Sequence, residues 1–291
     1  MRSIRIVCAC ALSLCAVMAV SLGSTSLASG ASTTLASCKA TIPSEEYTKG
    51  TLTVATDDPV YSPWFVNNKP TNGKGYESAL VYALANVLGI AKSHVKWAYE
   101  PFDSSYTPGT KHFDFDINEI SYTGARAHAV TFSVSYYNVN QSIVALKTDK
   151  IVKDHTPAEL KTYLYGDQIG TTGLAYINDY IKPTKSPRVF GTLDQAVEAL
   201  QLGQIDAIVI DTPTGQYMAS SQIMNAKKKL TATQVGQFPS VGEHYGLLFT
   251  KGNPLVGCIN VGLQALTSDG TLAALQHKWL GIYTSVPTIT P

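Results

Sequence analysis

The chain has no marked excess of charge of either sign. Its 291 residues include 22 lysines and arginines against 21 aspartates and glutamates, which gives a formal net charge of +1. Proteins that bind nucleic acid gather positive charge on one surface in order to neutralise phosphates. The one basic run, Lys227–Lys229, is short and is typical of a solvated helix end. We therefore expect no nucleic acid partner.

Long apolar runs are missing beyond the N-terminus. There, Arg2 and Arg5 precede an apolar stretch, residues 6–22, that is too short for a comfortable membrane span. A stretch of small and polar residues follows, and cleavage after Ala28 would suit a signal peptidase. We assign residues 1–37 to a signal peptide and a small polar spacer. The protein is then exported to the periplasm or to the extracellular face of the cell envelope.

Cysteine is scarce, and most of it lies in the signal segment. Only Cys38 and Cys258 follow the apolar stretch, and an even pair in an exported protein favours a disulfide. A lipid anchor is an alternative, because residues 35–38 read LASC, a lipoprotein cleavage pattern, although a polar gap separates it from the apolar stretch. Two free thiols are a third possibility. The sequence leaves these alternatives open.

Sequence signatures of catalysis are also missing. We find no GxSxG nucleophile elbow, no HExxH helix and no Walker A loop. The six histidines are scattered, and none has the spacing of metal ligands. We therefore expect a protein without a cofactor or a metal, and not an enzyme.

What the chain does have is an alternation of strands and helices. Predicted strands cover residues 51–56, 95–100, 113–121, 141–147, 205–213 and 245–251. Predicted helices cover residues 76–89, 155–164, 191–203, 253–266 and 271–281, and a strand end runs into a helix start over residues 167–173. This order predicts an α/β fold with mostly parallel sheets, and the number of units favours two lobes.

Polar groups gather where the predicted strands end. Ligands of open parallel sheets bind beyond the carboxyl ends of strands, and Arg126, Thr172 and Asp211 fall at such ends. Arginine can hold a carboxylate in a bidentate fork, a helix N-terminus adds donors, and aspartate can hold an ammonium group. Together they suit a zwitterion.

Each of these residues also has a plain structural interpretation. Arg126 could form a surface ion pair, Asp211 could cap the helix that begins at Thr212, and Thr172 could belong to an ordinary cap. For Trp64 we favour the core, and Tyr136–Tyr137 are expected to pack near a hinge.

A family resemblance adds to this. The order LTVATD, GKGYESAL, FDFDINEISYTGARAHAVTFS, GDQIGTTG, GQIDAIVIDTP and YGLLFTKGNPL resembles the extracellular solute-binding proteins of ABC importers for polar amino acids, from about residue 50 to 281. The strongest marker is Ser-x-Thr-x-x-Arg at Ser121, Thr123 and Arg126, although the family usually has Pro where this chain has Gly124.

The resemblance implies a type II periplasmic-binding-protein-like fold of two α/β lobes joined by two crossover hinge strands. Lobe 1 would comprise residues 38–141 with 242–291, and lobe 2 residues 142–241. Arg126 would bind a ligand carboxylate with Ser121 and Thr172, and Asp211 would bind the ammonium group. The full set of implied ligand contacts is Asp57, Asp58, Tyr61, Phe102, Glu119, Ser121, Arg126, Thr172 and Asp211.

Within this set, Tyr61 would cover the ligand, Phe102 would form a second wall, and either Asp57 or Asp58 would approach the ligand side chain. Glu119 stands where the family usually has a small residue, so its side chain could point at the ligand or away.

The implied function is an extracytoplasmic receptor that binds a polar or basic L-amino acid, closes its lobes and docks as a monomer on ABC permease subunits. Two alternatives are an exported cyclohexadienyl-type dehydratase, for which Glu119 is the candidate acid, and an amino-acid sensor without a transport role.

Overall fold

The computed structural model describes residues 33–281 and 286–289. The strands are β1 (Leu52–Thr56), β2 (Val95–Tyr99), β3 (Phe115–Asp116), β4 (Val130–Asn138), β5 (Gln141–Leu146), β6 (Gly166–Gln168), β7 (Arg188–Phe190), β8 (Ala207–Asp211), β9 (Ala232–Gln237) and β10 (His244–Thr250). The α-helices are α1 (Leu35–Glu45), α2 (Tyr76–Val87), α3 (Phe102–Ser105), α4 (Gly124–Ala129), α5 (Pro157–Leu160), α6 (Thr172–Tyr176), α7 (Leu193–Gln201), α8 (Thr212–Tyr217), α9 (Leu255–Ser268) and α10 (Thr271–Leu280). Short turns of other helix types are η1 (Pro70–Asn72), η2 (Lys92–His94), η3 (Lys150–Lys153), η4 (Ile177–Ile181) and η5 (Met218–Gln222).

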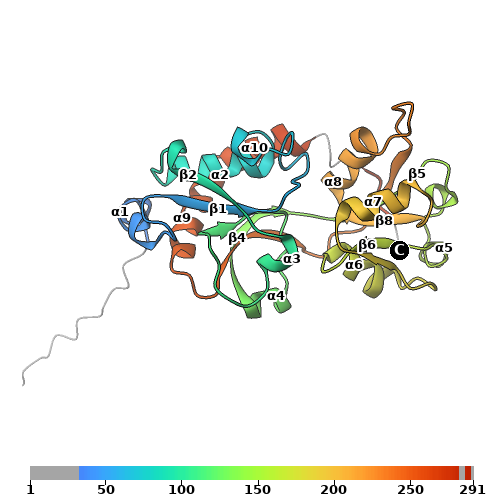
Figure 1. The fold of residues 1–291 in the computed structure, drawn as a ribbon, viewed down its shortest axis with the longest axis horizontal. Helices are drawn as coiled ribbons and strands as arrows, with labels where there is room; N and C mark the ends of the chain where they lie inside the picture. Colours follow the sequence, from blue (N-terminus) through green and yellow to red (C-terminus); the bar gives the residue numbers. More distant parts are fainter. Residues whose placement is uncertain (1–32, 282–285, 290–291) are drawn as a thin grey trace, which may run out of the picture. The chain divides into compact units, whose positions relative to one another are not determined.

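The first lobe is built on one sheet of five strands in the order β2-β1-β3-β10-β4. Figure 1 shows β1, β2 and β4 of this sheet with α2 and α10 on one side. Strands β1, β2 and β3 are parallel, and β10 runs antiparallel to β3 and β4. Alternate residues face opposite sides of a strand. In β10, Leu247 and Phe249 therefore join the core formed with α2, α9 and α10, whereas Leu248 faces the smaller core beside α3 and α4.

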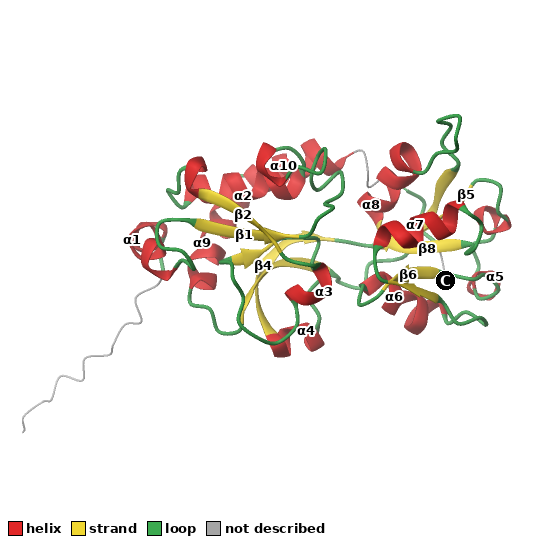
Figure 2. Cartoon of the chain, in the orientation of Figure 1, coloured by secondary structure: helices red, strands yellow, loops and turns green. Residues whose placement is uncertain are grey.

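The second lobe combines the sheet β8-β5-β9 with the parallel pair β6-β7. A parallel bridge between Tyr165 and Ala207 connects the two. Alternation again separates two cores: Ile143 and Ala145 of β5 face α6 and η4, and Val144 faces α7 and η5. Figure 2 shows the strands of both lobes between helices. The structure thus has the two-lobed α/β fold that the resemblance implied.

Two crossovers connect the lobes, one from β4 to β5 and the other from β9 to β10. They are neighbours, because the backbone N–H of Val139 donates to the carbonyl of Glu243 at 3.0 Å. The C-terminal residues come to the second lobe: Thr288 bridges Gln237 of β9, and the side chain of Ile289 is buried in the core of that lobe. Thr288 and Ile289 therefore pack on the second lobe, whereas the resemblance placed the whole segment 242–291 in lobe 1.

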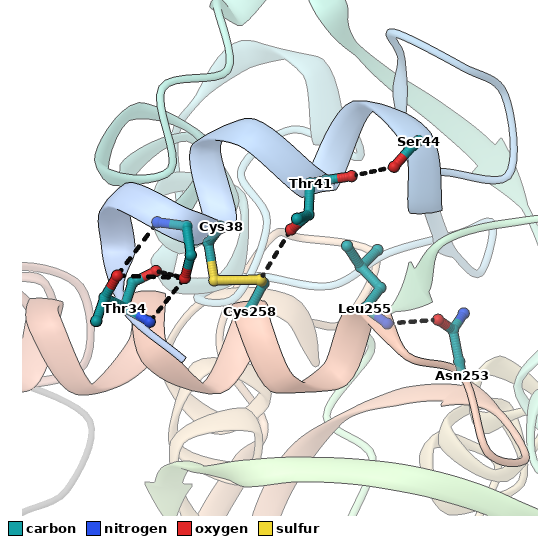
Figure 3. The surroundings of a disulfide bond; sticks show 8 residues. Thr34, Cys38, Thr41, Ser44, Asn253, Leu255 and Cys258 are labelled. Carbon is teal, nitrogen blue, oxygen red and sulfur yellow. Dashed lines mark hydrogen bonds between the residues drawn. A yellow bond between two sulfur atoms is a disulfide. The ribbon is translucent and has the colours of Figure 1, made fainter. Parts of the chain in front are cut away.

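A disulfide joins Cys38 of α1 to Cys258 of α9 (Figure 3), with the two Cα atoms 5.3 Å apart. Helix α1 begins after Thr34, whose hydroxyl accepts from the backbone of Ser37 in a capping box. Both half-cystines are buried in the core of the first lobe. The predicted disulfide is confirmed, and a sulfur bonded to Cys258 cannot also carry a thioether-linked lipid.

Most of the predicted elements are present, with two kinds of difference. The strand predicted over 113–121 is only β3, because the chain bends away at Glu119, which has a positive φ of 54°. Helix α1, strands β7 and β9 and the long strand β4 lie where no element was predicted. Trp64 is fully buried, as expected. Most of the predicted signal segment, residues 1–32, lies outside the described residues. Among those described, no helix has the length and apolar character needed to cross a membrane.

Candidate functional site

A cavity lies between the lobes, at the ends of strands from both sheets. It is lined from the first lobe by Asp57, Pro59, Tyr61, Phe102, Asn118, Glu119 and Arg126. Its remaining lining residues are Gln141, Asp167, Gln168, Thr171, Thr172, Gly173, Leu193, Val209, Ile210 and Asp211. Seven of the residues singled out from the sequence thus meet at one cavity: Asp57, Tyr61, Phe102, Glu119, Arg126, Thr172 and Asp211. Asp58 and Ser121 are not among its lining residues.

Arg126 is held at the cavity by the start of α4. The hydroxyl of Thr123 caps this helix by accepting from the backbone N–H of Arg126 at 3.1 Å. The guanidinium is buried and donates to two backbone carbonyls, that of Ser121 at 2.7 Å and that of Gly170 in the second lobe at 2.9 Å. Its carbon lies 4.5 Å from the ring centroid of Tyr106.

The guanidinium is not neutralised by an ion pair. Within the described part of the chain, ion pairs shorter than 4 Å join Lys111 to Glu100 and Lys150 to Asp154, so Arg126 belongs to neither. Burial lowers the pKa of Arg126 from its usual value, and the nearby Tyr106 raises it, but arginine stays charged in proteins. The surface ion-pair interpretation is therefore wrong for this residue, and a buried cation with unused donors faces the cavity.

Asp211 ends β8 on the opposite side of the cavity. It occupies the N-cap position of α8, but its side chain makes no capping hydrogen bond. One carboxyl oxygen instead accepts from Nε2 of Gln141 at 2.6 Å. Burial, and next the charge of Glu243, raise the pKa of Asp211 to about 7. The carboxyl is thus available for a ligand and changes charge near neutral pH.

Thr172 and Ser121 contribute differently. Thr171 caps α6 by accepting from the N–H of Leu174, and Thr172, the first residue of α6, lines the cavity. The hydroxyl of Ser121 donates to Oε1 of Glu243 at 2.6 Å. In this structure Ser121 is therefore engaged at the hinge, and only its carbonyl is close to the guanidinium of Arg126.

Glu119 reaches from the first lobe to the second. One of its carboxyl oxygens accepts from the hydroxyl of Thr214 at 3.0 Å, and the same hydroxyl accepts from the indole N–H of Trp64 at 2.7 Å. The backbone N–H of Glu119 donates to Glu77 at 2.8 Å, which supports the left-handed backbone at this position. Burial, together with the nearby Glu77, raises the pKa of Glu119 well above its usual 4.5. A neutral acid at this place can donate as well as accept.

Asp57 and Asp58 are distinguished by their contacts. Asp57 lines the cavity, and its carboxylate accepts from the backbone of Asp58 at 2.7 Å and of Phe102 at 3.3 Å. Asp58 accepts from the side chain of Asn68 at 2.9 Å on the exposed side of the turn. Tyr61 belongs to the first lobe but packs against the apolar core of the second lobe that lies beside α7 and η5. It therefore covers the cavity from across the lobes.

The polar residues of this region that sequence reasoning missed include Asn118, Gln141, Asp167, Gln168 and Glu243. Gln141 and Asp167 line the cavity, and Glu243 lies behind Gln141 on the second crossover. Asp167 is buried, and its Oδ2 has no hydrogen-bond partner in the structure. Gln141 stands at the first position of the strand predicted over 141–147, and Asp167 opens the stretch 167–173 in which a strand end runs into a helix start, so these two positions were signals that could have found both residues.

The cavity therefore combines one guanidinium with the carboxyl groups of Asp57, Glu119, Asp167 and Asp211. Within residues 33–281 and 286–289, no three or more histidine, cysteine, aspartate or glutamate side chains are grouped so that they could hold a metal ion. Such a cavity can hold a small ligand with a carboxylate at one end and positively charged groups at the other.

Comparisons with known proteins show the family of the chain. The sequence matches the bacterial extracellular solute-binding proteins, family 3, over residues 52–282. It is similar to the L-cystine-binding protein TcyJ of Escherichia coli (strain K12), with 26% identity over 235 residues, which are 80% of this chain and 84% of that protein. The arginine-binding periplasmic protein of Mannheimia haemolytica is 24% identical over 226 residues, 77% of this chain and 89% of that protein.

Solved structures show the same architecture. An ancestral arginine-binding protein bound to arginine superposes with a TM-score of 0.64 at 26% identity, covering 80% of this chain and 99% of that chain. The ancestral amino acid-binding protein AncCDT-1, a precursor of cyclohexadienyl dehydratase, gives a TM-score of 0.62 at 25% identity, covering 84% of this chain and 99% of that chain.

Proposed function

Because the chain belongs to the bacterial extracellular solute-binding proteins, family 3, we propose that it binds a polar or basic L-amino acid between its lobes as the receptor of an ABC importer. The observation that carries this proposal is the buried guanidinium of Arg126, which has carbonyl and aromatic neighbours but no carboxylate within 4 Å in the described residues. A ligand carboxylate would supply the missing anion through a charge-assisted pair.

Asp211 is the proposed partner of the ligand's ammonium group. It lines the same cavity as Arg126 but belongs to the other lobe. A zwitterion whose two poles are held by different lobes contacts both only when the lobes are together, so its binding favours the closed arrangement. Thr172 would assist at the carboxylate, and Tyr61 and Phe102 would cover the apolar part of the ligand.

The excess of acids favours a basic side chain. After Asp211 is assigned to the ammonium group, Asp57 and Glu119 still line the cavity. A cationic side chain would compensate the carboxylate charge that burial disfavours, whereas an acidic one would add to it. Similarity to arginine-binding proteins is consistent with this choice.

We propose the lobe boundaries 38–141 with 242–291 and 142–241, with residues 286–289 adding to the second lobe through their contacts with β9. The mature protein would be an exported monomer whose closed form docks on ABC permease subunits. It would carry out no chemical step on its ligand.

Calorimetry of the mature protein with L-arginine, L-lysine, L-glutamine and L-cystine tests the proposal. We expect saturable one-to-one binding of at least one of them. If L-arginine binds, agmatine, which is L-arginine without its carboxylate, should bind at least a hundredfold more weakly, because Arg126 then has no anion to hold. Equal binding of agmatine would contradict the role of Arg126, and a lack of binding by all four amino acids would contradict the proposed function.

Dehydration of a cyclohexadienyl acid is a second candidate. The observation in its favour is Glu119, a cavity carboxyl whose pKa burial holds well above its usual range, as a general acid requires. Incubation with prephenate and with arogenate would show the combined loss of water and carbon dioxide, which makes the ring aromatic, by ultraviolet absorbance, and no turnover of either would exclude this candidate. A sensor role would instead be favoured if no permease and ATPase genes lie beside this gene.

A further inference from the structure

Two residues on the crossovers are linked to three of the proposed ligand contacts. Gln141 begins β5 on the first crossover, and Glu243 precedes β10 on the second. Nε2 of Gln141 lies 3.1 Å from Oε2 of Glu243, and we call these two residues the hinge pair. Neither was identified from the sequence.

The hinge pair connects the lobes through side chains. Glu243 accepts from the hydroxyl of Ser121 in the first lobe at 2.6 Å. Gln141 Nε2 lies 2.6 Å from Oδ1 of Asp211 and 3.4 Å from Oγ1 of Thr172 in the second lobe. An amide nitrogen has two hydrogens, so three nearby acceptors, counting Glu243, share them. A change at one acceptor therefore alters the hydrogen bonds that Gln141 can donate to the other two.

We propose that the hinge pair positions the ligand contacts of both lobes, and that Glu243 sets how readily Asp211 takes the ammonium group of the ligand. Glu243 does so in two ways. Its carboxylate orients the amide of Gln141 toward Asp211, and its negative charge disfavours a second negative charge on Asp211. Glu243 is absent from the residues that line the cavity, so it acts through Asp211 and Ser121 rather than by touching the ligand.

The surroundings of Asp211 identify Glu243 as its main electrostatic neighbour. Burial is the largest cause of the raised pKa of Asp211, the charge of Glu243 is next, and Tyr245, Gln141 and Arg126 oppose them. Other titratable groups that interact with Asp211 from the elements packed around it are Glu77, Glu119, Tyr137 and Asp167. Glu243 differs from these four groups because its carboxylate also contacts the side-chain amide of Gln141, which donates to Asp211.

This arrangement makes ligand affinity depend on pH in a way that variants can separate. With its pKa at about 7, Asp211 would be ionised in about one molecule in eleven at pH 6 and in about ten in eleven at pH 8. An ammonium ligand binds the ionised form, so the apparent affinity should fall about tenfold from pH 8 to pH 6. Glu243→Gln removes the like charge and should reduce this ratio to about twofold, if the titration of Asp211 moves down by about one pH unit.

Gln141→Met should act in the opposite direction. It removes the donor to Asp211 but leaves the charge of Glu243, so the titration midpoint of Asp211 should rise. A variant that merely loosened the hinge would not shift the two midpoints in opposite directions. Glu198→Gln, on the exposed face of α7, removes one negative charge that is not among the causes of the raised pKa of Asp211 and serves as the matched control.

The experiment has a ligand-free arm and a ligand arm. In the first, carbon-13 NMR of the aspartate carboxyls follows the midpoint of Asp211 in the wild type and in the three variants. In the second, calorimetry with L-arginine compares affinities at pH 6 and pH 8. We expect a lower midpoint in Glu243→Gln, a higher one in Gln141→Met and no change in Glu198→Gln.

The outcomes separate this inference from the proposed function, on which only its ligand arm rests. Midpoints in Glu243→Gln and Gln141→Met that match the wild type overturn the hinge-pair inference, even if L-arginine binds tightly. Shifted midpoints without binding of L-arginine support the electrostatic link and count against a basic ligand. Shifted midpoints with an unchanged ratio of affinities overturn the claim that Asp211 takes the ammonium group.

Discussion

The two lobes share a strand order but present different chemistry to the cavity. In the first lobe the order is β2-β1-β3-β10-β4, and in the second the bridge at Tyr165 gives β7-β6-β8-β5-β9. The fourth strand in each order, β10 in the first lobe and β5 in the second, is the strand that follows a crossover. The first lobe supplies the guanidinium of Arg126, and the second supplies Asp167 and Asp211. A common backbone plan therefore leaves the function to the side chains at the strand ends.

The lobes also differ in how they are stabilised. The first has a disulfide and a group of packed aromatic rings, in which Trp64 lies 5.3 Å from Tyr137 and 5.4 Å from Tyr245, measured between ring centroids. The described part of the second lobe has no disulfide and relies on two smaller apolar cores. We infer that the first lobe is the more stable anchor, against which the second lobe moves.

The largest expected effect is on this difference in stability. Replacing both Cys38 and Cys258 by alanine should lower the free energy of unfolding by about 5 kcal/mol in the chain-entropy account, because the bridge spans a sequence separation of 220 residues. The loss should appear in hydrogen exchange of α1 and α9 and not in β5 or β8. Wild-type protein in reductant is the control. Equal losses in both lobes would contradict an anchor confined to the first.

Arg126 tests the chemical difference between the lobes. Arg126→Ala should weaken binding of the ligand by about 3 kcal/mol, more than a hundredfold, because its carboxylate loses a charge-assisted partner. Calorimetry measures the change. Arg188→Ala, an exposed arginine of the second lobe, is the matched control and should bind normally. Near-normal affinity of Arg126→Ala would refute the assignment.

Buried acids in both lobes predict that the ligand-free protein is more stable in mild acid. Burial raises the pKa of Glu77 from 4.5 to about 7. Between these two pH values the folded chain keeps a proton that the unfolded chain has lost, so stability falls as pH rises through this window, by about 3 kcal/mol for this group. Urea unfolding at pH 5 and pH 8 measures the fall.

Glu77→Gln should remove the contribution of Glu77 to this pH dependence, and Asp167→Asn should remove a corresponding one from the second lobe, because burial holds the pKa of Asp167 well above its usual 3.8. A pH dependence that stays the same in both variants would show that the two carboxyls are ionised in the folded protein.

The smallest expected effect concerns the contact between the lobes. Thr214→Val keeps the shape of the side chain but removes the partner of the Trp64 indole and the donor to Glu119. We expect ligand affinity to fall about tenfold, since an unpaired buried N–H costs about 1–3 kcal/mol. Thr267→Val, which removes a hydroxyl within α9 of the first lobe, should leave affinity unchanged. Identical affinities in both variants would mean that Thr214 does not help to hold the lobes together.

Local patterns were sufficient for much of the fold. Helix α7 falls within the helix predicted over 191–203. Its ends carry local signals, Thr192 and Gln195 at the start and Gly203 after the end, and the structure shows the capping box at Thr192. Strand β9 was missed because ATQVGQ alternates weakly and contains Gly236, next to which Ile289 packs. No local signal reports a contact made by the far end of the chain.

The sequence by itself determined the α/β alternation, the cysteine pair, and Arg126 as the candidate ligand-binding cation in the motif Ser121, Thr123 and Arg126. The alternation and the arginine motif depend on residues a few positions apart, whose periodicity and spacing are visible in the order of the chain. The cysteine pair follows from the number of cysteines left after the signal segment. Only the tertiary structure decided that Asp57 rather than Asp58 faces the cavity, and that Glu243 lies behind Gln141. The pKa of a buried carboxyl and the partner of a buried donor depend on groups far away in sequence, 122 residues for Ser121 and Glu243 and 150 residues for Trp64 and Thr214, and folding brings such groups together.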